Sequence, residues 1–254
     1  MVLTVDIGNT NITLGLYDKK ELKLVARIKT DPKKTADEYA ADLKNITALN
    51  GITEDFDGVI IGSVVPELTT ALKRAVQRLY GINALIVGPG IKTGLNIKVE
   101  NPAQLGADLV AGAVGALKKY PMPCIMIDMG TATTVFALNS KGEFVGGAIA
   151  AGVSTTLDAL TSHTAALPSI TVEPPPKAIG TETVKSMQSG IVFGTAAMID
   201  GLVKRMEAEL GEKATLVATG GKAEQIVKYC ERDIQVDDDL VLSGLLEIYR
   251  LNQK

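Results

Sequence analysis

Two short motifs combine a carboxylate with a glycine directly after an apolar run. The first covers residues 6–10 (Asp-Ile-Gly-Asn-Thr) and the second covers residues 128–133 (Asp-Met-Gly-Thr-Ala-Thr). Glycine permits a tight turn with exposed backbone N–H groups that can hold phosphate oxygens, and a carboxylate can hold hydrated magnesium. One such motif is equally consistent with a structural turn in which Asp6 accepts local amide hydrogen bonds. The second copy, almost half the chain later, favours a nucleotide site in a cleft between two domains.

A third carboxylate, Asp108, precedes a predicted helix of small and apolar residues at 109–117. A carboxylate at a helix start is either a cap favoured by the helix dipole or a base aimed into the cleft, and Asp108 alone favours the cap. The small residues require this helix to pack closely. Farther along, Thr-Gly-Gly at 219–221 follows a predicted strand, so it is as consistent with a strand-to-helix turn as with a surface for adenine or ribose.

The composition argues against several other classes of function. Cys124 and Cys230 are isolated and His163 is the only histidine, so zinc sites and Ser-His-Asp catalysis are not expected. The net charge is −3 with no basic stripe, which makes nucleic acid an unexpected partner. No apolar run approaches the roughly 20 residues that span a bilayer, and no signal-peptide pattern precedes the first predicted strand. We therefore expect a cytoplasmic protein.

The elements that would position these groups form two similar series. Each carboxylate motif follows the first strand of a predicted three-stranded meander, at 2–6, 12–17 and 22–28 and again at 124–128, 134–138 and 144–149. Further helices are expected at 35–50, 67–80, 109–120, 154–161, 183–209, 223–231 and 238–251, and further strands at 59–63, 84–87 and 214–218. This duplication predicts an α/β protein with two domains, 1–118 and 119–254, each containing a mixed sheet flanked by helices.

Taken together, the motifs make the sequence resemble the type III pantothenate kinases, within the superfamily of acetate kinase, sugar kinases, Hsp70 and actin. The resemblance covers essentially the whole chain and also rests on the segments 101–108, 146–149, 166–168, 180–190 and 219–221. It implies two duplicated actin-like (ribonuclease-H-like) domains with a cleft between them. It also implies a cytoplasmic homodimer that phosphorylates pantothenate with ATP, the first step of coenzyme A biosynthesis.

The resemblance implies a role for each motif. Asp108 would be the catalytic base, Asp128 would hold a monovalent cation (K⁺ or NH₄⁺), and Thr131 would contact ATP. Magnesium would bind at Asp6. The ATP phosphates would lie on a set of eight consecutive residues: Asp6, Ile7, Gly8, Asn9, Thr10, Asn11, Ile12 and Thr13. The pantothenate side would comprise Val99, Gly106, Ala107, Asp108, Leu109 and, from the other subunit of the dimer, Thr183.

Three positions depart from the family pattern. Leu109 replaces the arginine that usually follows Gly-Ala-Asp and helps to hold the substrate, and Val99 replaces a tyrosine of the pantothenate wall. The segment 134–136 reads Thr-Val-Phe where the family tends to have Thr-Thr-Phe-Asp. Two alternatives follow: a kinase for another small hydroxylated acceptor, or a noncatalytic ATP-binding regulator. Asp108 favours an enzyme, because a sensor would not need the base.

Overall fold

The computed structural model describes residues 1–52 and 55–253, which form two compact units. Unit 1 contains residues 1–95, 100–118 and 239–254, and unit 2 contains residues 96–99 and 119–238. The predicted domains, 1–118 and 119–254, differ from this division at two places: residues 96–99 belong to unit 2, and the C-terminal segment from Asp239 belongs to unit 1. Helix α7 (Leu240–Leu251) belongs to unit 1, because its apolar face packs against the sheet of that unit.

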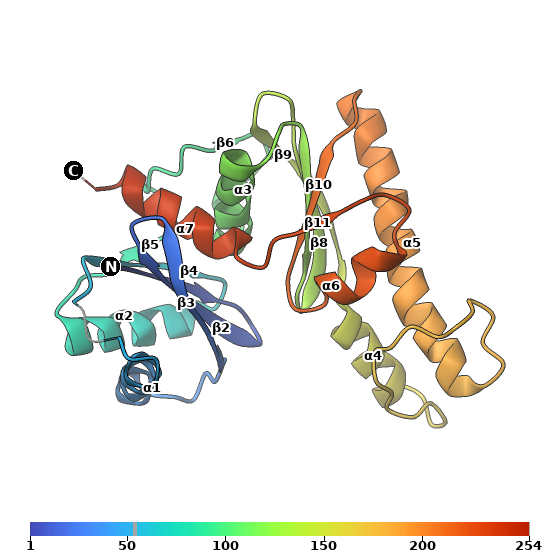
Figure 1. Cartoon of the computed structure of the whole chain (residues 1–254), viewed down its shortest axis with the longest axis horizontal. Coiled ribbons are helices and arrows are strands. Elements are labelled where there is room, and N and C mark those ends of the chain that lie inside the picture. Colours follow the sequence, from blue (N-terminus) through green and yellow to red (C-terminus); the bar gives the residue numbers. More distant parts are fainter. Residues whose placement is uncertain (53–54, 254) are drawn as a thin grey trace. The chain divides into compact units, whose positions relative to one another are not determined.

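Unit 1 is built on a five-stranded mixed sheet (Figure 1). Its strands are β1 (Val2–Ile7), β2 (Asn11–Asp18), β3 (Glu21–Lys29), β4 (Gly58–Ser63) and β5 (Leu85–Ile86). They lie in the order β3-β2-β1-β4-β5, with β1, β2 and β3 antiparallel and with β4 and β5 parallel to β1. The predicted meander and both later strands of this half are therefore confirmed.

Helices cover both faces of this sheet (Figure 1). The helices α1 (Ala36–Leu49) and α2 (Pro66–Tyr80) share one core with the buried side chains of β1 and β2. A capping box of Thr35 and Glu38 starts α1, and Gly81, with a φ of 69°, ends α2. On the other face, α7 contributes Leu242 and Leu246 to a small apolar cluster. The first turn of unit 1 is thus held on a sheet that is packed on both sides.

The small residues of α3 (Ala107–Lys119) permit a very close crossing with α7. A Cβ atom at Gly244 would collide with the carbonyl oxygen of Ala111, and a Cβ at Gly115 would collide with that of Leu240. The close packing predicted from the small residues of this helix is therefore confirmed. The helix begins at Ala107, so Asp108 lies in its first turn instead of preceding it.

Unit 2 contains a six-stranded mixed sheet in the order β11-β10-β7-β8-β9-β6. Its strands are β6 (Asn96–Ile97), β7 (Cys124–Met129), β8 (Ala132–Leu138), β9 (Glu143–Ala151), β10 (Thr215–Thr219) and β11 (Gln235–Val236). The helices α4 (Val153–Ser162), α5 (Thr183–Leu210) and α6 (Ala223–Ile226) accompany it, and side chains of α5 and α6 share the main core of the unit with β7, β8 and β10 (Figure 1). The second predicted meander is confirmed.

Two details of unit 2 differ from the sequence predictions. The helix expected at 223–231 ends at Ile226 and continues as a 3₁₀ turn over Val227–Tyr229. The strands β6 and β11 were not predicted, because two residues are too few to show a period.

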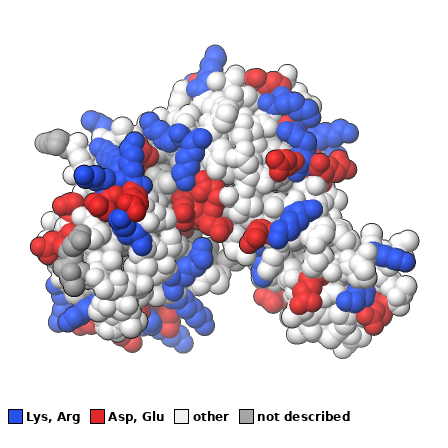
Figure 2. Space-filling view, viewed as in Figure 1, with Lys and Arg blue, Asp and Glu red and all other residues white. Residues whose placement is uncertain are grey.

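No helix in the described part of the chain combines the length and the apolar character that crossing a bilayer requires. Acidic and basic side chains are interspersed over the face that Figure 2 shows.

Candidate functional site

The first carboxylate turn lies between β1 and β2 of unit 1. The backbone N–H of Gly8 donates a hydrogen bond of 3.0 Å to the carbonyl oxygen of Asn11, which closes the turn. Ile7 and Ile12 are fully buried at its two ends, whereas residues 9–11 are exposed. A firmly anchored turn therefore presents backbone groups to solvent, which is the arrangement that phosphate binding by amides requires.

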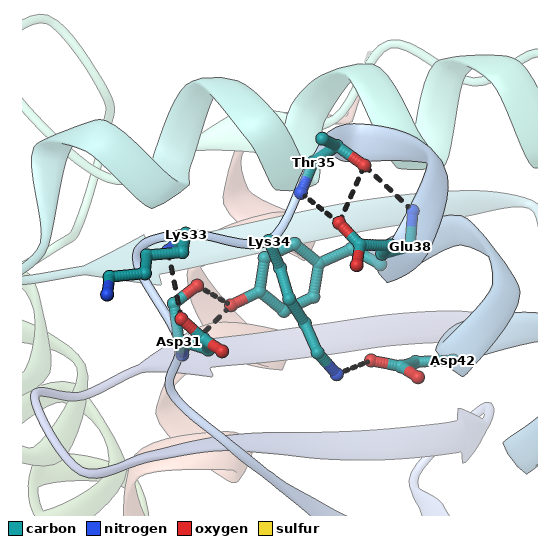
Figure 3. Close-up of polar contacts among 7 residues, drawn as sticks. Asp31, Lys33, Lys34, Thr35, Glu38 and Asp42 are labelled. Atoms are coloured by element: carbon teal, nitrogen blue, oxygen red, sulfur yellow. Dashed lines mark hydrogen bonds and ion pairs between the residues drawn. The ribbon is translucent and has the colours of Figure 1, made fainter.

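Strand β3 and the loop after it brace this turn. Thr30 is only 8% exposed; its hydroxyl donates to the Gly8 carbonyl at 2.7 Å and its N–H donates to the Thr10 carbonyl at 3.0 Å. The next residue is fixed in turn, since the Tyr39 hydroxyl donates to the Asp31 carbonyl at 2.8 Å and accepts from the Asp31 N–H at 3.1 Å (Figure 3). The shape of the turn is thus set partly by a residue some twenty positions away.

The loop itself is held by polar contacts that Figure 3 shows. Asp31 accepts from the N–H of Lys33 at 2.9 Å, and Lys34 forms an ion pair of 2.7 Å with Asp42. The capping box at the start of α1 completes this cluster. These contacts fix the end of β3 close to the first turn without using any group of the turn itself.

The strand register aligns Asp6 with the start of α3. Asp6 is paired with Thr13 on β2 and with Gly62 on β4, so these three residues form a row across one face of the sheet. A Cβ built on Gly62 would lie 3.8 Å from the Cβ of Ala107, the residue before Asp108. The structure therefore brings Asp6, Thr13 and the first turn of α3 to the same face of unit 1.

Asp108 has the environment of a carboxylate that resists ionisation. Burial raises the pKa of its carboxyl group above the ordinary value, and a hydrogen bond of 2.7 Å from the Leu109 N–H to Oδ1 opposes that rise. A side chain at Gly106 would collide with Oδ1 and would also lie 3.5 Å from Val64. Gly106 therefore leaves room for the carboxylate, and a raised pKa suits a group that accepts a proton near neutral pH.

The second carboxylate turn, between β7 and β8 of unit 2, has the same closing bond but a different brace. The N–H of Gly130 donates to the Ala132 carbonyl at 3.0 Å. The carbonyl of Thr131 accepts from the N–H of Gly152 at 3.1 Å and from the hydroxyl of Thr155 at 2.7 Å. A Cβ at Gly152 would overlap the carbonyl oxygens of this turn. The start of α4 is thus pressed directly against the second turn.

Asp128 lies among oxygen atoms and backbone. It pairs with Thr134 on β8 and with Thr219 on β10, so two threonines flank it on the same face of the sheet. Gly220 has a φ of 94°, and a Cβ there would lie 2.6 Å from Asp128 Oδ1. Because only glycine fits this conformation and this space, the Thr-Gly-Gly motif is explained as a turn that lets the chain approach Asp128.

The remaining predicted residues lie apart from these turns or beside Asp108. Ala107 and Leu109 belong to the first turn of α3. Val99 lies in unit 2, where its side chain approaches the backbone of Gly146. Thr183 is the exposed first residue of α5. It borders an open groove whose apolar lining comes from Leu160, Leu167, Met187 and Ile191.

Sequence reasoning missed the residues that support the turns. Thr30, Gly62 and Gly152 belong to no predicted motif of the nucleotide site, and only strand pairing or a close backbone approach identifies them. Within the described residues, no group of three or more His, Cys, Asp or Glu side chains could hold a metal ion. A magnesium ion bound through one carboxylate and substrate phosphates needs no such group.

The comparisons with known proteins agree with this architecture. A model of the family described as type III pantothenate kinase matches residues 2–205. A type III pantothenate kinase from an Exiguobacterium species is 44% identical over 255 residues, which cover 100% of both chains. Another from Moorella thermoacetica is 42% identical over 99% of this chain and 100% of its own length.

A solved structure extends the likeness to the fold. Component A of (R)-2-hydroxyglutaryl-CoA dehydratase from Acidaminococcus fermentans matches with a TM-score of 0.59 at 17% identity, covering 98% of this chain and 96% of that one. Two mixed sheets flanked by helices, each with a carboxylate turn after its first antiparallel strand, define an actin-like α/β protein, as predicted. Within that class, the chain belongs to the type III pantothenate kinase family.

Proposed function

We propose that this protein transfers the γ-phosphate of ATP to the primary hydroxyl of pantothenate, forming 4′-phosphopantothenate for coenzyme A biosynthesis. The family supplies the reaction class. The observation that carries the proposal is the shared sheet face of Asp6 and the start of α3, where the partly buried carboxyl of Asp108 has a raised pKa. This pairs a metal-binding carboxylate with a base, the two groups that phosphoryl transfer to an alcohol needs.

The first turn suits the phosphates of ATP. The backbone of residues 8–11 and the hydroxyls of Thr10 and Thr13 would donate to phosphate oxygens, and Asp6 would hold magnesium directly or through water. A magnesium ion held there would neutralise charge on the phosphates. The buried side chains of Ile7 and Ile12 anchor the two ends of the turn, so the binding groups are positioned before the nucleotide binds.

Asp108 would orient the acceptor hydroxyl and accept its proton as the new O–P bond forms. Such a base contributes about 10²–10⁴ to the rate. Because the Leu109 N–H holds Oδ1, the other carboxylate oxygen, Oδ2, is the one we assign to the proton. No histidine is needed for this step.

Asp128 would bind a monovalent cation, K⁺ or NH₄⁺. The carboxylate and the hydroxyls of Thr134 and Thr219 on the same sheet face supply hard oxygen ligands. A bound cation would reverse the local field of a carboxylate that would otherwise repel a nucleotide phosphate. We also propose that Thr131, in the adjacent turn, contacts ATP, as the resemblance to type III pantothenate kinases implies.

We also propose a homodimer in which Thr183 of one subunit approaches the pantothenate of the other. The groove beside Thr183, bordered by Leu160, Met187 and Ile191, gives α4 and α5 an apolar surface that a second copy would cover. Measuring the molar mass of the purified chain by light scattering tests this assignment, and a monomer at enzyme concentrations would contradict it.

The identity of the acceptor depends on Val99 and Leu109. An arginine at position 109 would offer a carboxylate a bidentate contact of about 1.5–3 kcal/mol, and leucine offers none. The alternatives are therefore a kinase of another small hydroxylated acceptor and a noncatalytic ATP-binding regulator.

The decisive experiment compares wild type and Leu109→Arg over a panel of hydroxylated acids and alcohols that includes pantothenate. We expect wild type to phosphorylate pantothenate, and Leu109→Arg to lower the KM for pantothenate about tenfold to a hundredfold with little change for ATP. Turnover of another alcohol alone would retain the kinase and reject pantothenate. ATP binding without turnover of any acceptor would favour the regulator.

A further inference from the structure

Strand β3 carries two cations on the same sheet face as the first carboxylate turn. Arg27 pairs with Thr13 and Lys29 pairs with Asn11, so the row that begins at Gly62 and Asp6 continues through Thr13 to Arg27. Adjacent strands lie about 4.8 Å apart, which places the Cα atoms of Arg27 and Asp6 about 10 Å from each other. Both cationic side chains therefore stand beside the phosphate-binding turn within unit 1.

The register that produces this row is firmly fixed. Ile12 is fully buried opposite Ile28, and a slip of one residue would turn these side chains out of the core. Along the described pairing of β2 with β3, the register shifts only between Leu16 and Tyr17, at the far end from the turn. Thr30 then ties the end of β3 to Gly8 and Thr10. The position of Arg27 is thus a property of the fold.

The side chains of Arg27 and Lys29 are also accessible to a bound ligand. Both side chains are exposed, and among the described residues no hydrogen bond or ion pair engages either one. By contrast, Lys23 on the same strand pairs with Glu21 at 2.7 Å. The turn needs such groups, because residues 6–13 include no lysine or arginine while the triphosphate brings several negative charges.

The order of groups along the row suggests a role in the reaction. Asp108 lies at the acceptor end, Asp6 follows, and Arg27 lies at the opposite end beyond Thr13. As the bond between the γ-phosphorus and the bridging oxygen breaks, negative charge develops on the departing β-phosphate of ADP. A guanidinium at the end opposite the base would face that charge.

We propose that Arg27 and Lys29, the β3 cations, bind the β- and γ-phosphates of ATP and stabilise the ADP leaving group. The role in the reaction rests on the proposed function. The predicted contact with the phosphates does not, because it applies to any nucleoside triphosphate that binds at this turn. A rival explanation is that charges on β3, an edge strand, only prevent pairing with other chains.

The test is a nucleotide series. Binding of adenosine, AMP, ADP and ATP with magnesium is measured by calorimetry on the full chain for wild type, Arg27→Gln, Lys29→Gln and the double variant. We expect Arg27→Gln to weaken ATP at least about tenfold and to leave adenosine and AMP within twofold, as for loss of a charge-assisted contact. Lys23→Gln is the control, because it removes an equal charge from the same strand at the end far from the turn.

Kinetics separate this proposal from the proposed function. The β3 variants should raise the KM for ATP and lower kcat while the KM for pantothenate stays constant, and Arg27→Lys should restore part of the loss. If wild type turns over no acceptor, the kinase assignment fails while the nucleotide series still decides on the β3 cations. ATP affinity within twofold of wild type in the double variant overturns the proposal, with aggregation pointing to edge protection. A change in the KM for pantothenate alone overturns it as well.

Discussion

The two carboxylate turns share one backbone plan and differ in what surrounds them. In each, the glycine N–H closes the turn onto a carbonyl two or three residues ahead, at 3.0 Å in both cases. The first turn is braced from the side by Thr30 and leaves residues 9–11 exposed. The second is pressed by Gly152 at the start of α4 and by Gly220 beside Asp128.

This difference fits the two functions that we propose for the duplicated motif. An open turn with exposed amides can bind a group with many acceptor oxygens, such as a polyphosphate. In the second turn Gly130 and Thr131 are exposed as well, but the backbone at Gly152 and Gly220 approaches closely. The space beside Asp128 is therefore smaller and better suited to a single small cation among oxygen ligands. The glycines beside the second turn, Gly152 and Gly220, have no space for a side chain, and this close packing distinguishes the second turn from the first.

The largest predicted effects come from replacing the carboxylates of the two turns, Asp6 and Asp128, which should change different properties of the enzyme. Asp6→Asn should lower kcat by about 10²–10³, because it weakens the hold on magnesium and on the charge that the ion neutralises. Asp128→Asn should instead make the rate indifferent to potassium. Initial rates over series of magnesium and potassium concentrations measure both effects. Wild-type rates that are equal in potassium and in a bulky organic cation would contradict the role of Asp128.

A smaller effect is expected from the braces. Thr30→Val removes the hydroxyl that donates to Gly8, and Thr155→Val removes the one that donates to Thr131. Each bond contributes about 0.5–1.5 kcal/mol, so we expect Thr30→Val to raise the KM for ATP about twofold to tenfold. Thr155→Val should mainly shift the potassium dependence. If the two variants behave alike, the turns do not have separate functions.

The smallest effect on activity should come from an ion cluster around the buried Glu207 in unit 2. Glu207 is 6% exposed and contacts Arg232 at 2.6 Å, Lys213 at 2.9 Å and the Ala214 N–H at 3.0 Å. These contacts lower the pKa of its carboxyl to about 2, although burial opposes them. Glu207→Gln should therefore reduce the free energy of unfolding at pH 7 by about 2–4 kcal/mol while kcat and both KM values stay constant.

The sign of the pH dependence follows from that lowered pKa. The stabilisation by Glu207 is complete above the unfolded-state pKa, near 4.5, and is lost as the pH falls toward 2. Urea denaturation at several pH values should show that the difference in the free energy of unfolding between wild type and Glu207→Gln becomes smaller below about pH 4.5. A constant difference over that range would show that the cluster acts through packing alone.

Sequence patterns predicted the strands and long helices well, because burial imposes clear periods on them. The meanders at β1–β3 and β7–β9 have alternating or continuous apolar runs, and α5 is long. The membership of α7 in unit 1 was not predictable, since its leucines would suit either domain. Within the site, Asp6, Asp108 and Asp128 were found from their motifs, but Thr30 and Arg27 owe their positions to pairing between distant residues.

The most direct test of the central claim, a kinase with a carboxylate base, is Asp108→Asn. Burial raises the pKa of Asp108, and the base must be ionised, so wild-type kcat should fall as the pH is lowered through a range above that of an ordinary carboxyl group. Asp108→Asn keeps the shape of the side chain and should retain ATP affinity, lose at least about 10²-fold in kcat, and show no such pH dependence. Near-normal turnover by Asp108→Asn, with the same pH profile as wild type, would contradict the account.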